Sequence, residues 1–122
     1  MKEQDRATVL ELAKKLYDRK ALDIVALDIT KLTPLADYML IVSGRNANQV
    51  KAIADDADDA MAQMGFEPRR KDGQSEGRWI VIDYGNILLE IFHQEERSFY
   101  NLERLWEDGE NRIELPFDQT ED

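Results

Sequence analysis

The chain has 122 residues, 43% of them apolar, and a formal net charge of −10. This length suits a single domain with a sizeable core, and the lack of cysteine excludes disulfides and thiolate metal sites. No apolar run approaches the roughly eighteen residues of a membrane span, and the start of the chain lacks a signal-peptide pattern, so we expect a cytoplasmic protein.

The first part of the chain predicts one helix and two strands. Apolar residues recur at helical spacing over residues 5–20. A β-branched and apolar run at 23–29 predicts a strand, and Thr33-Pro34 then breaks the chain. Residues 38–42 are apolar throughout, which is typical of a strand that is covered on both faces.

A second helix is predicted after the Ser43-Gly44 turn. Asn46 can cap its start, Gln49 would complete a capping box, and Gly65 is a natural left-handed residue at its end. Its apolar residues follow a 3.6-residue period, and several are alanines that would let the helix lie close to a sheet. Its outer face is acidic and is interpreted as solvated: Asp55, Asp56, Asp58 and Asp59.

Three strands are predicted next. Residues 66–71 suit a short edge strand, because Pro68 argues against a central place. Residues 79–84 and 87–92 are two further strands. They are joined by Gly85-Asn86, a pair that suits the two-residue turn of a β-hairpin.

The last predicted helix opens with Glu95 and Glu96 at its positive end. Beyond it, residues 107–122 carry a net charge of −6, which predicts a flexible acidic C-terminal segment. The pattern as a whole predicts one α/β domain over residues 1–106, with a mixed sheet of four to five strands packed by helices. The expected buried stripe of the last helix is Phe99, Leu102, Leu105 and Trp106.

The chain offers little catalytic or metal-binding chemistry. His93 is the only histidine, and a lone imidazole is more often a structural or interface residue than a metal ligand or a base. Asp56 and Asp58 follow Ser43-Gly44 in a way that resembles the metal-binding acids of nucleotidyltransferases. Inside a helix, however, residues i and i+2 diverge by about 200° and cannot share metal ions. We therefore expect no catalytic residue, no cofactor and no metal.

Arg69-Arg70-Lys71, with Arg78 nearby, is the one basic cluster. It could contact RNA phosphates, but adjacent cations on an edge strand more often discourage edge-to-edge aggregation. The acidic balance of the chain disfavours a non-specific nucleic-acid binder and would steer it towards a basic protein surface. We expect no direct sequence-specific contact with nucleic acid.

Aromatic residues gather in the predicted hairpin and last helix. Phe92, Phe99 and Trp106 are expected in the core. Alternation along the first hairpin strand places Trp79 and Tyr84 on opposite faces, and so small a sheet does not bury both faces equally. The face with Trp79 is therefore predicted to be available to a partner, since Trp and Tyr are the residues that anchor interfaces.

Several motifs stand at specific separations between about residue 7 and residue 106. They are Thr30-Lys31-Leu32-Thr33, Ala36-Asp37-Tyr38, Ser43-Gly44, Trp79-Ile80-Val81-Ile82-Asp83-Tyr84-Gly85 and Phe99-Tyr100-Asn101-Leu102-Glu103-Arg104-Leu105-Trp106. Their combination resembles the ribosomal silencing factor family, also called the Iojap-related proteins.

The resemblance implies a nucleotidyltransferase-like α/β fold without the catalytic residues. It implies binding to the large ribosomal subunit through ribosomal protein uL14, the fourteenth in the universal naming. Bound there, the protein would block joining of the small and large subunits and repress translation under nutrient limitation. A role in large-subunit biogenesis is also associated with the family. The residues that match its partner-binding pattern are Trp79, Asp83, Tyr84, Gly85, His93 and Tyr100.

Two positions between residues 86 and 90 depart from the family pattern, because Asn86 stands where Asp is usual and Glu90 where His is common. The resemblance therefore does not imply a binding role for residues 86–90.

Three other interpretations stay open. An apolar hairpin face exposed in the free protein invites homodimerisation. An active nucleotidyltransferase-like enzyme on a small nucleotide substrate would need acids converging from neighbouring strands, such as Asp28, Asp37 and Asp83. A protein adaptor with a non-ribosomal partner is the third.

Overall fold

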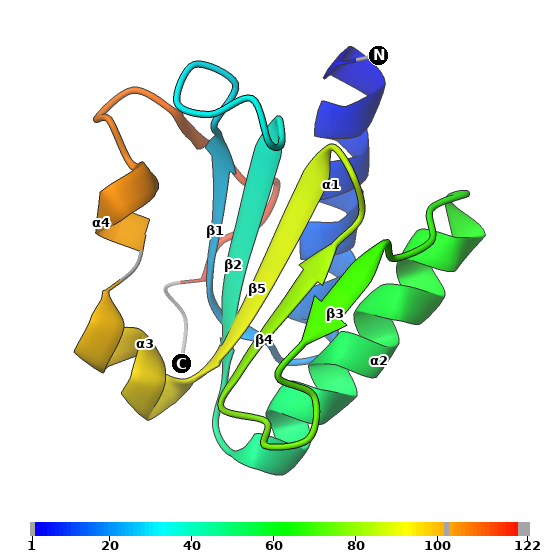
Figure 1. Cartoon of the computed structure of the whole chain (residues 1–122), viewed down its shortest axis with the longest axis vertical. Coiled ribbons are helices and arrows are strands. Elements are labelled where there is room, and N and C mark those ends of the chain that lie inside the picture. Colours follow the sequence, from blue (N-terminus) through cyan, green and yellow to red (C-terminus); the bar gives the residue numbers. More distant parts are fainter. Residues whose placement is uncertain (1, 102, 120–122) are drawn as a thin grey trace.

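The computed structural model describes residues 2–101 and 103–119. Leu102, expected in the buried stripe of the last helix, lies outside the described residues, as do residues 120–122 of the acidic segment. Figure 1 shows a twisted sheet with helices on both sides. The elements in chain order are α1 (Lys2–Asp18), β1 (Leu22–Asp28), β2 (Tyr38–Gly44), α2 (Ala47–Gln63), β3 (Arg70–Asp72), β4 (Trp79–Asp83), β5 (Ile87–His93), α3 (Gln94–Tyr100), α4 (Glu103–Trp106) and β6 (Arg112–Ile113).

One six-stranded sheet, in the order β3-β4-β5-β2-β1-β6, forms the centre of the fold. β2 and β5 are parallel, and the other neighbouring strands are antiparallel. The predicted α/β class and mixed sheet are therefore confirmed, with one strand more than expected. β2 is buried along its whole length, as its apolar sequence predicted, and β3 lies at the edge of the sheet.

The two faces of the sheet are covered differently. α1 and α2 lie together on one face (Figure 1), and the main core fills the space between them and the sheet. The second face carries a smaller apolar cluster around Ile41 and Phe92. Trp79, Leu88 and Trp106 pack against that cluster and stay partly exposed. The second face is therefore the less completely covered of the two.

α2 shows how local sequence signals determine an element. The Asn46 carboxamide oxygen accepts a hydrogen bond from the Gln49 amide at 2.8 Å, as predicted for the cap. The Gln49 side chain reaches back to the amide of Arg45 at 2.6 Å, one residue earlier than in a capping box. At the other end, Gly65 has φ +89 and the Phe66 amide donates to the Met61 carbonyl, which is the Schellman arrangement that ends a helix.

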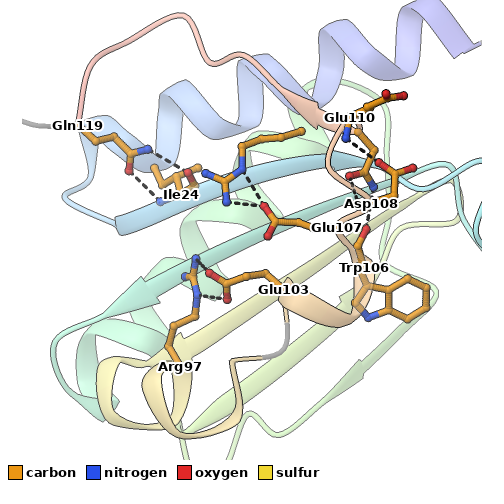
Figure 2. A network of polar contacts seen from close by, with 10 residues as sticks. Ile24, Arg97, Glu103, Trp106, Glu107, Asp108, Glu110 and Gln119 are labelled. Carbon is orange, nitrogen blue, oxygen red and sulfur yellow. Dashed lines mark hydrogen bonds and ion pairs between the residues drawn. The ribbon is translucent and has the colours of Figure 1, made fainter.

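The described part of the acidic C-terminal segment, residues 107–119, lies against the rest of the fold through contacts that the sequence did not predict. Arg112–Ile113 form β6, which pairs with β1, and the Phe117 ring stacks on Tyr17 at 4.3 Å. Figure 2 shows the Gln119 side chain against the backbone of Ile24, with bonds of 2.8 Å to its amide and 2.9 Å to its carbonyl. The prediction relied on the acidic character of the segment and overlooked an alternating apolar pattern that suits an extended segment on a sheet edge. The apolar residues of this pattern are Ile113, Leu115 and Phe117.

The last predicted helix is two short helices, because Asn101 adopts a left-handed conformation with φ 50 between α3 and α4. The expected burial of Phe99 and Leu105 is wrong, since their side chains are 79% and 74% exposed. The break at Asn101 ends the helical period on which a continuous stripe depends. Trp106 packs only partly against the sheet.

A buried arginine holds α3 and α4 to the sheet. The guanidinium of Arg97 donates to both carboxylate oxygens of Glu103, at 2.8 and 3.2 Å, and to the Ser43 hydroxyl at 2.8 Å. Figure 2 shows the first of these pairs between the two helices. Hydrogen bonds and the charge of Arg97 lower the pKa of Glu103, against the opposing effect of its burial. This ion pair joins α4 to α3, the helix that carries Phe99 and Tyr100.

Candidate partner-binding surface

The hairpin formed by β4 and β5 presents one face to α1 and α2 and the other to the outside. Ile80 and Ile82 are buried in the main core, as the alternation of the strand predicted. The other side chains form what we call the open hairpin face, which consists of Trp79, Val81, Asp83, Leu88 and Glu90. The first four of these are partly exposed, and Glu90 is buried between them.

Trp79 is the centre of an aromatic group at one end of the hairpin. Its ring stacks on Phe92, with centroids 5.0 Å apart, and lies tilted against Tyr100 at 5.6 Å. Tyr100 in turn meets Phe99 edge-on at 5.0 Å, and its own side chain is 50% exposed. The result is a large indole held in one orientation by its neighbours while part of it stays open to solvent.

Glu90 lies below this indole and was not among the predicted site residues. Its Oε1 accepts a hydrogen bond of 3.0 Å from Trp79 Nε1, and only 5% of the residue is exposed. Burial raises the pKa of Glu90, and the hydrogen bond from Trp79 partly opposes that rise. The signal in the sequence was one acid within an otherwise apolar strand, on the face shared with Trp79.

His93 has a structural role at the end of β5. Its Nδ1 accepts a hydrogen bond of 3.1 Å from the Glu95 amide and so caps α3. The partly exposed ring lies one residue beyond Phe92, the cross-strand partner of Trp79. His93, Trp79 and Tyr100 are thus brought to the same end of the hairpin.

The remaining predicted site residues lie at the other end of the hairpin, in its turn. Asp83 Oδ1 accepts a hydrogen bond of 2.8 Å from the Gly85 amide. Gly85 has φ +97, and a Cβ there would lie 3.3 Å from the Arg69 guanidinium. The turn therefore favours glycine for its backbone conformation, and an added Cβ would also press on the Arg69 side chain.

Tyr84 points away from the open hairpin face. Its side chain is 4% exposed, and its hydroxyl donates to Asp58 Oδ1 on α2 at 2.7 Å. Asp58 also pairs with Lys71 on β3. Burial first, and then the hydrogen bond to Asp58, raise the pKa of Tyr84. The six predicted residues consequently form no single surface, because Tyr84 connects the hairpin to the helix-covered side.

The acids proposed for an enzyme are not brought together. Asp28 ends β1 and Asp83 ends β4, and β2 and β5 lie between those strands. The distance between β1 and β4 across the sheet is therefore about 14 Å at the usual strand spacing. Asp28 Oδ1 also accepts hydrogen bonds from the amide and hydroxyl of Thr30. Within residues 2–101 and 103–119, no three His, Cys, Asp or Glu residues form a group that could hold a metal ion.

Most cations of the predicted basic cluster form ion pairs with acidic side chains of this chain. Lys71 pairs with Asp58, Arg70 Nε lies 3.1 Å from Asp72, and Arg78 lies 2.8 Å from Glu96. These cations lie on or beside the β3–β4 edge of the sheet. None of the described helices is both long enough and apolar enough to cross a membrane.

Comparison with known proteins assigns the family. Residues 2–122 match the family described as "Ribosomal silencing factor during starvation". The chain is 42% identical over 106 residues to ribosomal silencing factor RsfS of Bacillus subtilis, covering 86% of this chain and 90% of that protein. It is 29% identical over 109 residues to the chloroplastic protein Iojap of Zea mays, covering 89% of this chain and 47% of that longer protein.

Two solved structures share the fold. A Bacillus halodurans protein, 36% identical, superposes with a TM-score of 0.74 and covers 87% of this chain and 96% of its own. A Chromobacterium violaceum protein, 28% identical, superposes with a TM-score of 0.77 over 92% of both chains. The family assignment also confirms the expectation that the chain is a regulator of translation and not an enzyme. On these matches, the chain belongs to the ribosomal silencing factor family.

Proposed function

We propose that this protein binds the large ribosomal subunit through the open hairpin face, with ribosomal protein uL14 as its contact. Occupying that site would block joining of the small subunit and repress translation under nutrient limitation. The support is the family assignment together with a sheet face on which an aromatic anchor stays partly open. We also propose a role in large-subunit biogenesis and a cytoplasmic location, as the family resemblance implies.

The observation that carries the proposal is the setting of Trp79. A large aromatic side chain held rigidly by its neighbours, but still partly exposed, is the kind of residue that contributes most to a protein interface. Because stacking on Phe92 and a tilted contact with Tyr100 orient the indole before a partner arrives, little side-chain entropy would be lost on binding.

Charge supports a basic partner. The chain carries a net charge of −10, whereas ribosomal proteins are commonly basic, so long-range attraction would speed their encounter. The silencing step itself requires no chemistry, only occupancy of the surface that the small subunit approaches. Electrostatic repulsion of the incoming rRNA would add little, since screening lengths are about 8 Å at cellular salt.

The six predicted residues would then serve in two ways. We propose that Trp79, Asp83 and Tyr100 contact the partner directly, because each is at least partly exposed near the open hairpin face. His93 would act chiefly by capping α3 and so positioning Tyr100. Tyr84 and Gly85 would act by holding the hairpin turn in place.

Cosedimentation with separated ribosomal subunits tests the proposal. The wild-type protein is expected to sediment with large subunits and not with small ones, and Trp79→Ala is expected to remain in the supernatant. Phe66→Ala removes a partly buried aromatic that packs against the main core instead, so it serves as the matched control. Undiminished binding of Trp79→Ala would show that this indole only packs.

Self-association of the free protein is a related proposal. The open hairpin face and the exposed side chains of Phe99 and Leu105 would be covered in a homodimer. Analytical ultracentrifugation at tens of micromolar should then show dimers that Trp79→Ala weakens. Monomers throughout that range would refute the dimer without affecting the proposed ribosomal role.

We further propose that the α/β fold is nucleotidyltransferase-like but has no catalytic acids. The likeness in fold is what the family resemblance implies, and the lack of catalytic acids is supported by the separation of Asp28 from Asp83 and by the place of Asp56 and Asp58 within α2. Isothermal titration with magnesium nucleotides should give no binding heat. Saturable binding followed by turnover would favour the alternative, an active enzyme on a small nucleotide.

A further inference from the structure

Glu90 is a carboxylate in the middle of an otherwise largely apolar surface. On its own face, its cross-strand neighbours are Val81 on β4 and Ile41 on β2. Trp79 and Asp83 are its diagonal neighbours on β4, at about 7 Å between backbones. An ionised group in such a position costs free energy unless it is paired or hydrogen-bonded.

The pairing of Glu90 within this chain is incomplete. Oε1 accepts the hydrogen bond from Trp79, whereas Oε2 accepts none from the residues described. Every fully buried side-chain oxygen of the described residues has a hydrogen-bond partner. Because Oε2 has no such partner, it is not fully buried and keeps some contact with solvent. No Lys, Arg or His among them lies within 4.0 Å of either oxygen.

The cations at this end of the hairpin already have acidic partners. Arg97 is bound to Glu103, and Arg78 pairs with Glu96. Neither ion pair includes Glu90, so these two cations of the chain leave Oε2 without a positive partner. The neighbouring indole adds a second attraction for a cation, because the face of a tryptophan ring is electrostatically negative.

We infer that Glu90 and Trp79 together form a receptor for one Lys or Arg side chain of the partner protein. The aliphatic part of that side chain lies along the indole, and its cation meets Oε2 of Glu90. Asp83, on the same face, adds negative potential around the entry. The inference rests on the proposed function and deepens it, since it states which chemistry the partner must present to the open hairpin face.

Glu90→Gln tests how much the negative charge of Glu90 alone contributes to binding. Glutamine keeps the shape of the side chain and an oxygen that can accept from Trp79, but it carries no charge. Asp55→Asn is the matched control, because it removes the same charge from an exposed position on α2. Binding of each protein to purified large subunits, and to isolated uL14, is measured by titration at about 0.15 M and about 0.3 M salt.

Glu90→Gln is expected to bind at least about tenfold more weakly than wild type, because it leaves a partner cation unpaired in a desolvated contact. The deficit should persist at the higher salt, where an exposed charge is largely screened. Asp55→Asn should stay within about twofold of wild type. Equal affinities of Glu90→Gln and wild type would overturn the inference alone. If wild-type protein bound neither target, the proposed function would fail first and this inference with it.

Discussion

The two ends of the β4–β5 hairpin use neighbouring residues for opposite purposes. At the turn, Tyr84 points inward and hydrogen-bonds to Asp58 on α2. At the other end, Trp79 stacks on Phe92 on the second face of the sheet and stays partly exposed. One short motif therefore supplies both the attachment of the hairpin and the surface proposed to bind.

This contrast shows why a family motif is not itself a binding site. Alternation along a strand sends successive side chains to opposite faces, so residues that match a motif together divide between core and surface. Variants at the turn should consequently affect mainly folding stability, and variants at the other end mainly binding. The expected effects follow from the largest to the smallest.

Tyr84→Ala should give the largest change, a loss of about 3 to 5 kcal/mol in the free energy of unfolding, as expected for removing a buried aromatic ring. Urea denaturation followed by circular dichroism measures it. Tyr84→Phe keeps the ring and loses only the hydrogen bond to Asp58, so it should cost about 1 kcal/mol. A loss below about 1 kcal/mol for Tyr84→Ala would refute the anchoring role.

Trp79→Ala should show the opposite pattern. Binding to large subunits is expected to weaken by about 2 kcal/mol or more, as at an interface hot spot. The loss of folding stability should be smaller than that of Tyr84→Ala, because Trp79 is only partly buried. Fluorescence titration and urea denaturation on the same preparation give both values. The contrast between the two ends would fail if stability fell and affinity did not.

Gly85→Ala tests the turn with a smaller change. A methyl group at φ +97, with its Cβ 3.3 Å from Arg69, should cost about 1 to 2 kcal/mol in stability. Thermal denaturation should show a lower midpoint for this variant. Gly65→Ala serves as the control for backbone strain alone, because Gly65 also has a positive φ but has open space where a Cβ would lie. Equal losses at the two positions would show that contact with Arg69 adds nothing.

The smallest expected effect is the pH dependence due to Glu90. Burial raises its pKa above the ordinary 4.5. A carboxyl with a raised pKa in the folded state favours folding below the ordinary pKa and loses that contribution as pH rises through its folded value. The stability of Glu90→Gln relative to wild type should therefore increase with pH above about 4.5. A difference independent of pH between 4 and 8 would contradict this.

The sequence predicted best what depends on local signals. α2 and its ends followed from Asn46, Gln49 and Gly65, and the hairpin from Gly85-Asn86, since caps and two-residue turns are determined by a few adjacent residues. Alternation also correctly placed Trp79 on the face opposite Ile80 and Ile82. What alternation does not determine is which strand face the helices will cover.

Long-range contacts account for what the sequence did not predict. β6 depends on pairing with β1 across more than eighty residues of chain, and the acidic character of the segment concealed its apolar alternation. The left-handed Asn101 divides the last helix, and Phe99 and Leu105, on either side of it, are exposed. A continuous helical period did not predict this break. Glu90 gained its significance only from the indole placed over it by the neighbouring strand.

Cosedimentation of Trp79→Ala and Tyr84→Phe with separated ribosomal subunits, measured side by side, tests the central claim most directly. If the open hairpin face binds, Tyr84→Phe should sediment with large subunits as wild type does, and folded Trp79→Ala should not. Retention of Trp79→Ala on large subunits, or a loss of binding confined to Tyr84→Phe, would contradict the account.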